Sequence, residues 1–268
     1  MIFIGEGING LNPAVRRALL ERDRPAVQRL ARLQAEAGAA YLDLHVGTAW
    51  PRPAQVMAWL VETAQEAVGT PLALDSNRLD VVRAGLKVCR SAVMINAATG
   101  EREKLPAFMA LAVEHGASLV VLTMDERGIP QHAVGRLAIA KRILDCADEH
   151  GLPRDRLFLD PVLLPMKFSQ SQGPIVLEAI RGIRLEKDPP HAVLGLSNGS
   201  QGTKERGLIN RTLLVMAMAC GLDAVIADVL DVRLREAAAA AEVILENQPY
   251  SDQFLSEVRQ WEERARSG

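Results

Sequence analysis

Short apolar runs alternate with longer amphipathic segments along the whole chain. The runs are rich in Val, Ile and Leu, which is typical of strands that are buried on both faces. They predict strands at residues 2–5, 41–46, 72–75, 92–96, 118–123, 157–160, 192–196 and 224–228. Between the runs, apolar residues recur every three to four positions, which predicts helices at 26–37, 53–68, 79–88, 103–114, 134–149, 174–183, 209–220 and 230–245.

This alternation predicts an α/β fold in which a parallel sheet closes into a (β/α)8 TIM barrel. No linker interrupts the pattern, so we expect a single domain over residues 1–268. A doubly wound open sheet is the alternative, but no Gly-x-Gly-x-x-Gly turn follows the first apolar run. The amphipathic stretch 253–264 predicts a further C-terminal helix that covers the barrel or packs on a partner.

Composition excludes several classes of protein. The chain has 31 basic and 33 acidic side chains, and only 4% of its residues are aromatic, which disfavours nucleic-acid binding. Charges interrupt the apolar runs well before membrane-spanning length, and no signal peptide is expected. The three cysteines show no paired spacing, which indicates reduced thiols in a cytoplasmic protein.

Polar residues stand where the predicted strands end. In chain order they are Glu6, Asp43, Asp75, Asn96, Asp125, Asp160, Asn198 and Asp228. In a barrel the carboxyl ends of the strands form one rim, where loops gather and chemistry takes place. An acid at such a position can instead cap the following helix. For any one Asp taken alone, both interpretations stay open.

A rim of carboxylates and amides without a basic cluster suits a ligand that offers N–H donors. Each charge-assisted hydrogen bond of that kind contributes about 1.5–3 kcal/mol. Binding of Mg²⁺ or Ca²⁺ is the competing use of carboxylates. It is less favoured because the acids come from separate strands without local ligand spacing, so we expect no metal. His45 follows Asp43 at a strand end, and we expect its side chain to face the rim.

Eight stretches in order carry a resemblance to a known family. They are "GEGING" (5–10), "LDLHVG" (42–47), "LALDSN" (72–77), "MINAATGEREK" (94–104), "LAVEHGASLVVLTM" (111–124), "LDPVLLP" (159–165), "VLGLSNGSQ" (193–201) and "LINRTLLVMAMACGLDAVIAD" (208–228). Together they closely resemble methyltetrahydrofolate:corrinoid methyltransferases, which belong to the pterin-binding barrel family with dihydropteroate synthase. The resemblance covers nearly the whole chain.

The resemblance implies methyl transfer between N5 of methyltetrahydrofolate and the cobalt of a corrinoid. The corrinoid is supplied by a partner protein, and the enzyme is expected to be a homodimer. The implied folate-binding positions are Asp43, Asp75, Asn96, Asp160, Asn198, Gln201 and Arg206. Asp160 matches the carboxylate that pairs with the amino group and ring N–H of the pterin, and Asp75 and Asn96 match side chains that hold the rest of that edge.

Asn198 matches the amide beside the methyl-bearing nitrogen and is predicted to be catalytic. An amine leaves slowly unless it gains a proton or a hydrogen bond as the carbon–nitrogen bond breaks. Asn carries a donor and an acceptor on one side chain, so by rotating it can meet the nitrogen before and after protonation. A carboxylate could only accept, and a Lys would repel the cation being formed.

The chain departs from the family pattern at two positions near the rim. Gly7 stands where the family usually has Arg, and His45 where it usually has Asn. These changes could alter the corrinoid partner or the preferred direction of transfer, between which the sequence does not choose.

Two alternative functions are less favoured by the sequence. Dihydropteroate synthase would need a Lys on the seventh strand and an Arg-His pair after the eighth. This chain has Ser197-Asn198 and Asp228-Val229 in those places. A non-catalytic folate-binding subunit is the other alternative, and Asn198 speaks against it because simple binding does not require that residue.

Overall fold

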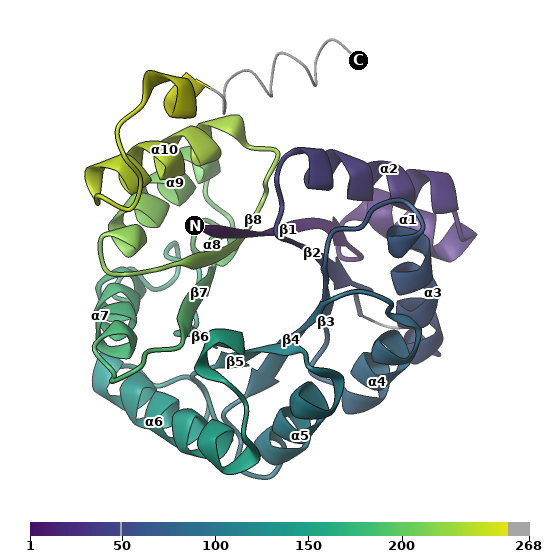
Figure 1. Ribbon diagram of the computed structural model, residues 1–268, viewed down its shortest axis with the longest axis horizontal. Helices are drawn as coiled ribbons and strands as arrows, with labels where there is room; N and C mark the ends of the chain where they lie inside the picture. Colours follow the sequence, from purple (N-terminus) through teal and green to yellow (C-terminus); the bar gives the residue numbers. More distant parts are fainter. Residues whose placement is uncertain (49, 257–268) are drawn as a thin grey trace.

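The computed structural model describes residues 1–48 and 50–256 and contains a closed barrel of parallel strands ringed by helices (Figure 1). The strands follow one another around the barrel in chain order. Their bounds are β1 Ile2–Asn9, β2 Tyr41–His45, β3 Leu72–Asp75, β4 Val93–Thr99, β5 Ser118–Leu122, β6 Leu157–Asp160, β7 His191–Gly195 and β8 Ala224–Ala227. Pairing of β1 with β8, from Ile2↔Ala224 to Gly5↔Ala227, closes the sheet and confirms the predicted TIM barrel.

The helices predicted between and after the strands, up to residue 245, are all present, and their ends differ from the prediction by three residues or fewer. The helices are α1 Pro13–Glu21, α2 Arg24–Glu36, α3 Pro53–Gln65, α4 Leu79–Val88, α5 Leu105–His115, α6 Ala133–His150, α7 Gln172–Arg184, α8 Leu196–Gly199, α9 Arg206–Met218 and α10 Val232–Ile244. A short 3₁₀ turn, Arg154–Arg156, precedes β6.

The sequence pattern missed α1 and α8. The signals for α1 are local ones at its ends, because its buried face is only three residues wide. The Asn12 side chain accepts a hydrogen bond from the Ala14 N–H at 2.9 Å, and Pro13 occupies the first turn. Arg22 ends the helix in the left-handed conformation, with φ of 55°.

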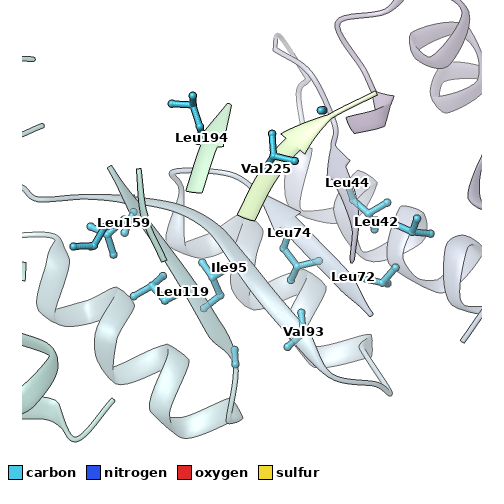
Figure 2. Close-up of a cluster of buried hydrophobic side chains, with 14 of the residues drawn as sticks. Leu42, Leu44, Leu72, Leu74, Val93, Ile95, Leu119, Leu159, Leu194 and Val225 are labelled. Atoms are coloured by element: carbon cyan, nitrogen blue, oxygen red, sulfur yellow. The ribbon is translucent and has the colours of Figure 1, made fainter. Parts of the chain in front are cut away.

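Two apolar layers hold the barrel together. Alternate strand residues point outward and pack under the helices, as Figure 2 shows for Leu42, Leu44, Leu72 and Leu74 of β2 and β3. The other alternate residues fill the barrel itself. This inner layer consists of Ile4, Ala73, Met94, Val120, Phe158, Val193 and Ala224. The inner layer matters for function because the residues above it form the floor of a cavity.

The C-terminal prediction is only partly covered by the structure. Residues 252–256 are helical, and the rest of the predicted helix at 253–264 lies outside the described residues. Cys89, Cys146 and Cys220 are free thiols. In the described part of the chain, every helix is too short or too polar to cross a membrane.

Candidate active site

A cavity of about 640 Å³ opens at the carboxyl ends of the strands. Each strand of the described barrel contributes at least one residue to its lining. These residues are Glu6, Asn9, Asp43, His45, Asp75, Asn96, Ala97, Leu122, Asp160, Gly195 and Ile226. The loops add Trp50, Ser76, Asn77, Arg78 and Asn198, among others. Six of the eight predicted rim residues therefore line one cavity.

The two-residue period of a strand explains why these polar side chains share the cavity. Side chains at positions i and i+2 point to the same side of a sheet. Asp75, Asn96 and Asp160 each stand two residues beyond a member of the inner apolar layer, namely Ala73, Met94 and Phe158. They consequently lie one layer higher in the barrel, where apolar packing ends and the cavity begins.

Glu6 stands two residues beyond Ile4 of the inner layer and lines the cavity, and a bulge in β1 lies at the same place. The register with β2 shifts between Gly5 and Ile8, and the Gly7 N–H donates to Oε1 of the buried Gln34 at 2.8 Å. A Cβ on Gly5 would lie 2.5 Å from the same oxygen, and one on Gly7 would lie 2.9 Å from it. Gly7 thus faces α2 and is absent from the cavity lining, contrary to our interpretation that it borders the rim.

Asp43 and Asp75 form a coupled acidic pair at the base of the cavity. Burial raises the pKa of Asp43 well above its usual range, and the charge of Asp75 adds to this effect. The Asn96 amide opposes it by donating from Nδ2 to Asp43 Oδ1 at 2.9 Å. Burial raises the pKa of Asp75 to about 6, and nearby His45 acts in the opposite direction. Because the two carboxyl groups interact, they titrate as a pair, and burial disfavours a negative charge on both of them at once.

Asp160 is a second buried carboxyl group at the rim. Its Oδ1 accepts the Val162 N–H at 2.7 Å, and its Oδ2 accepts the Gly195 N–H at 3.3 Å. Burial raises the pKa of Asp160 to about 6, while these two bonds and the charge of Arg136 lower it. At neutral pH Asp160 is mainly a carboxylate with remaining capacity to accept hydrogen bonds from a ligand.

Asn198 projects from α8, the short helical turn directly after β7. Its side chain is exposed and lines the cavity. A Cβ on Gly195 would lie 2.9 Å from Asn198 Nδ2 and 3.9 Å from Asp160 Oδ2. The amide of Asn198 therefore passes directly over Gly195, on the same side as the Asp160 carboxylate.

Two predicted site residues lie outside the cavity lining. Gln201 is exposed on the turn after α8. Arg206 donates from Nε to Ser200 Oγ at 3.2 Å and from Nη2 to the Ser197 carbonyl at 3.3 Å. Arg206 thus supports the backbone that carries Asn198.

Two of the strand-end acids make local contacts away from the cavity, but neither caps the following helix, because α6 and α10 begin after His132 and Asp231. Asp125 is bound by Arg127 and Arg142, each at 2.9 Å, and these bonds lower its pKa to about 2. Asp228 accepts the Leu230 N–H at 3.0 Å and so stabilises the turn after β8. Both lie outside the cavity lining.

His45 faces the cavity, as predicted, and its tautomer follows from its neighbour Asn9. Asn9 Oδ1 accepts the Leu11 N–H at 2.9 Å and lies 3.0 Å from His45 Nδ1. Because a backbone N–H only donates, the shared Asn9 atom is the amide oxygen, and His45 Nδ1 carries a hydrogen. The sequence pattern missed Asn9 because it ended the first strand at Gly5.

Among the cavity acids, Asp43 accepts from the Asn96 amide and Asp160 from two backbone N–H groups. No group of three or more His, Cys, Asp or Glu side chains within residues 1–48 and 50–256 could hold a metal ion.

Comparison with known proteins places the chain in a family. The model of a family described as pterin binding enzyme matches residues 14–228, which is most of the chain. The chain belongs to the pterin-binding enzyme family.

Among relatives in the pterin-binding family, the methylcorrinoid:tetrahydrofolate methyltransferase of Eubacterium limosum is 30% identical over 262 residues, which cover 97% of each chain. Methionine synthase of Mycobacterium tuberculosis is 28% identical over 239 residues, which are 84% of this chain and 20% of that protein. A dihydropteroate synthase structure from Thermus thermophilus superposes with a TM-score of 0.65 at 20% identity, covering 91% of this chain and 94% of that one. At that identity the superposition shows the shared fold alone.

Proposed function

We propose that this protein is a methyltransferase that moves a methyl group between N5 of methyltetrahydrofolate and the cobalt of a corrinoid carried by a partner protein. The observation that carries the proposal is the single cavity in which Asp75, Asn96, Asp160 and Asn198 meet. The methyltransferase of Eubacterium limosum, at 30% identity over 97% of both chains, supports the same reaction.

The cavity suits the polar edge of a reduced pterin. That edge presents an amino group and a ring N–H side by side, so it needs adjacent acceptors. Asp160 and Asp75 supply carboxylates that burial has stripped of much of their hydration. A ligand that donates hydrogen bonds to these carboxylates replaces the solvation free energy that they lost on burial, which favours a pterin over water.

In the reaction the carbon–nitrogen bond at N5 breaks, the carbon bonds to cobalt(I), and N5 takes up a proton. We propose that Asn198 hydrogen-bonds N5 as this charge develops, because its exposed amide can turn either its donor or its acceptor inward. Negative charge on Asp75 and Asp160 nearby favours a protonated N5 over a neutral one.

A dihydropteroate synthase is less well supported. Its pyrophosphate leaving group requires cations beside the seventh and eighth strands. In the described structure the cavity lining from that side consists of Gly195, Asn198 and Ile226, without a basic side chain.

We further propose that the protein works in the cytoplasm as a homodimer, as the resemblance implies. Light scattering of the purified protein tests the dimer, and a monomeric mass at micromolar concentration would contradict it.

The activity test mixes the protein with methyltetrahydrofolate and a reduced corrinoid and follows the visible spectrum of the cobalt. We expect conversion of cobalt(I) to methylcobalt at a rate proportional to the enzyme concentration.

Asn198→Ala should keep the folate affinity within about tenfold while turnover falls roughly 10²–10³-fold. Retained folate binding without any spectral change, with several corrinoids, would instead favour a non-catalytic folate-binding subunit. Equal losses of affinity and turnover in the variant would contradict the catalytic role of Asn198.

A further inference from the structure

An arginine is completely buried beside the cavity and takes no part in the proposed chemistry. Arg136 of α6 is 0% exposed. Its guanidinium donates from Nε to the Pro130 carbonyl at 3.1 Å and from Nη1 to the carbonyls of Pro161 and Val162 at 2.6 and 2.9 Å. Nη2 donates to Gln172 Oε1. All four acceptors are neutral, so the hydrogen bonds leave the positive charge of Arg136 without a bonded counter-ion.

The segment that Arg136 holds is strained. Val162 has φ of 64°, in the left-handed region that β-branched residues avoid. Such a conformation persists only where the surroundings fix it on several sides. Here the Val162 N–H donates to Asp160 Oδ1 at 2.7 Å, while the Val162 carbonyl accepts from Arg136 at 2.9 Å. The turn is therefore held between the guanidinium and the carboxylate.

Arg136 and Asp160 interact electrostatically. Asp160 raises the pKa of Arg136, and Arg136 in turn lowers the pKa of Asp160. The other titratable groups that line the cavity are Glu6 on β1, Asp43 and His45 on β2, Asp75 on β3, and Arg78 in the loop after β3. The Val162 and Gly195 N–H groups favour the charged form of Asp160, and Arg136 adds a positive charge behind it.

We propose that Arg136 is a positioning residue for pterin binding, which fixes the Pro161-Val162 turn and holds Asp160 as a carboxylate aimed into the cavity. This inference rests on the proposed function, since it takes a reduced pterin as the ligand of Asp160. Arg136 acts from the helix side of the barrel wall and does not touch the substrate.

The test measures the affinity for tetrahydrofolate between pH 5 and pH 9, by calorimetry or by quenching of protein fluorescence. In the wild type, affinity should fall as the pH drops through about 6, where Asp160 and Asp75 take up protons. Arg136→Gln removes the charge and should move the midpoint of this fall upward by about one pH unit. Arg136→Lys keeps the charge but loses the forked hydrogen bonds, so it should weaken binding at every pH with an unmoved midpoint.

Two further variants separate charge from geometry. Val162→Gly relaxes the strained turn without touching the guanidinium, and the midpoint should stay where it is. In an Asp160→Asn background, Arg136→Gln should leave the remaining pH dependence unchanged, because its target carboxylate is gone.

The outcomes distinguish this inference from the proposed function. Absence of tetrahydrofolate binding by the wild type overturns the proposed function itself. Wild-type binding combined with an unmoved midpoint in Arg136→Gln overturns only the role of Arg136. If Arg136→Gln does not fold, a midpoint that moves in Arg136→Lys, where the charge is retained, overturns the role as well.

Discussion

Gly195→Ala is the substitution that isolates the position of the Asn198 amide. The backbone of Gly195, with φ of −71° and ψ of 83°, does not require glycine. The new Cβ would lie 2.9 Å from Asn198 Nδ2, whereas ordinary van der Waals contact begins at 3.4 Å. The amide must therefore move by about half an ångström or rotate away, and it can do so easily because it is the exposed end of a side chain.

The expected effect falls on turnover and not on stability. Relief of the contact by an exposed side chain costs little, and replacing Gly by Ala stabilises by about 0.4–1 kcal/mol through the unfolded state. Turnover should fall about 10–100-fold, since a displacement of this size misplaces a transition-state donor whose complete loss costs about 10²–10³-fold. Folate affinity should stay within about threefold, because the Asp160 oxygen is 3.9 Å from the new atom.

The assay is the cobalt spectral change at saturating folate, with thermal unfolding measured in parallel. Gly69→Ala is the matched control, since a Cβ there meets nothing within 4 Å. In an Asn198→Ala background, Gly195→Ala should cause no further loss, because the group that it displaces is gone. Wild-type turnover in Gly195→Ala, or the same fold-loss in both backgrounds, would refute the reasoning.

Three further predictions follow from the buried groups. Asp160→Asn should weaken folate binding more than it slows transfer from bound folate, and unchanged affinity by calorimetry would count against the pterin orientation. Asp75 has a folded pKa of about 6, above its unfolded value of about 4. Its ionisation therefore lowers the stability of the fold increasingly as the pH rises between these values, and the loss is complete above about pH 6. Asp75→Asn should accordingly add about 1–2 kcal/mol of stability at pH 8 and have little effect at pH 4; calorimetry that finds the same change at both pH values contradicts this. Gly7→Ala should destabilise by about 1–3 kcal/mol, because its Cβ would lie 2.9 Å from Gln34 Cδ in a buried site, and a wild-type denaturant midpoint would show that Gln34 can move aside.

The sequence by itself determined the barrel and most of the polar residues of the cavity. Both follow from local geometry, because a strand repeats every two residues and a helix every 3.6. Ala73 and Asp75 necessarily share a face, as do Met94 and Asn96. Once the strands were recognised, the placement of these polar side chains at one rim followed from the parallel direction of the strands.

Local geometry also explains where the sequence interpretation failed. The first strand continues past Gly5 because a side chain from another element, Gln34, accepts the N–H that the bulge leaves unpaired. The periodicity of residues 2–9 contains no sign of that acceptor. As a result, the sequence placed Gly7 at the rim and overlooked Asn9.

The tertiary structure alone decided which groups act on one another. Arg136 lies 25 residues before Pro161 along the chain, and only packing of α6 beside the end of β6 brings its guanidinium to the turn that supports Asp160. The raised pKa values of Asp43 and Asp75 likewise depend on burial, since two hydrated carboxyl groups would both ionise at neutral pH. Side-chain periodicity is a property of the backbone and can be read along the chain, whereas pairing and charge state depend on distances and solvent exclusion that exist only once the chain has folded.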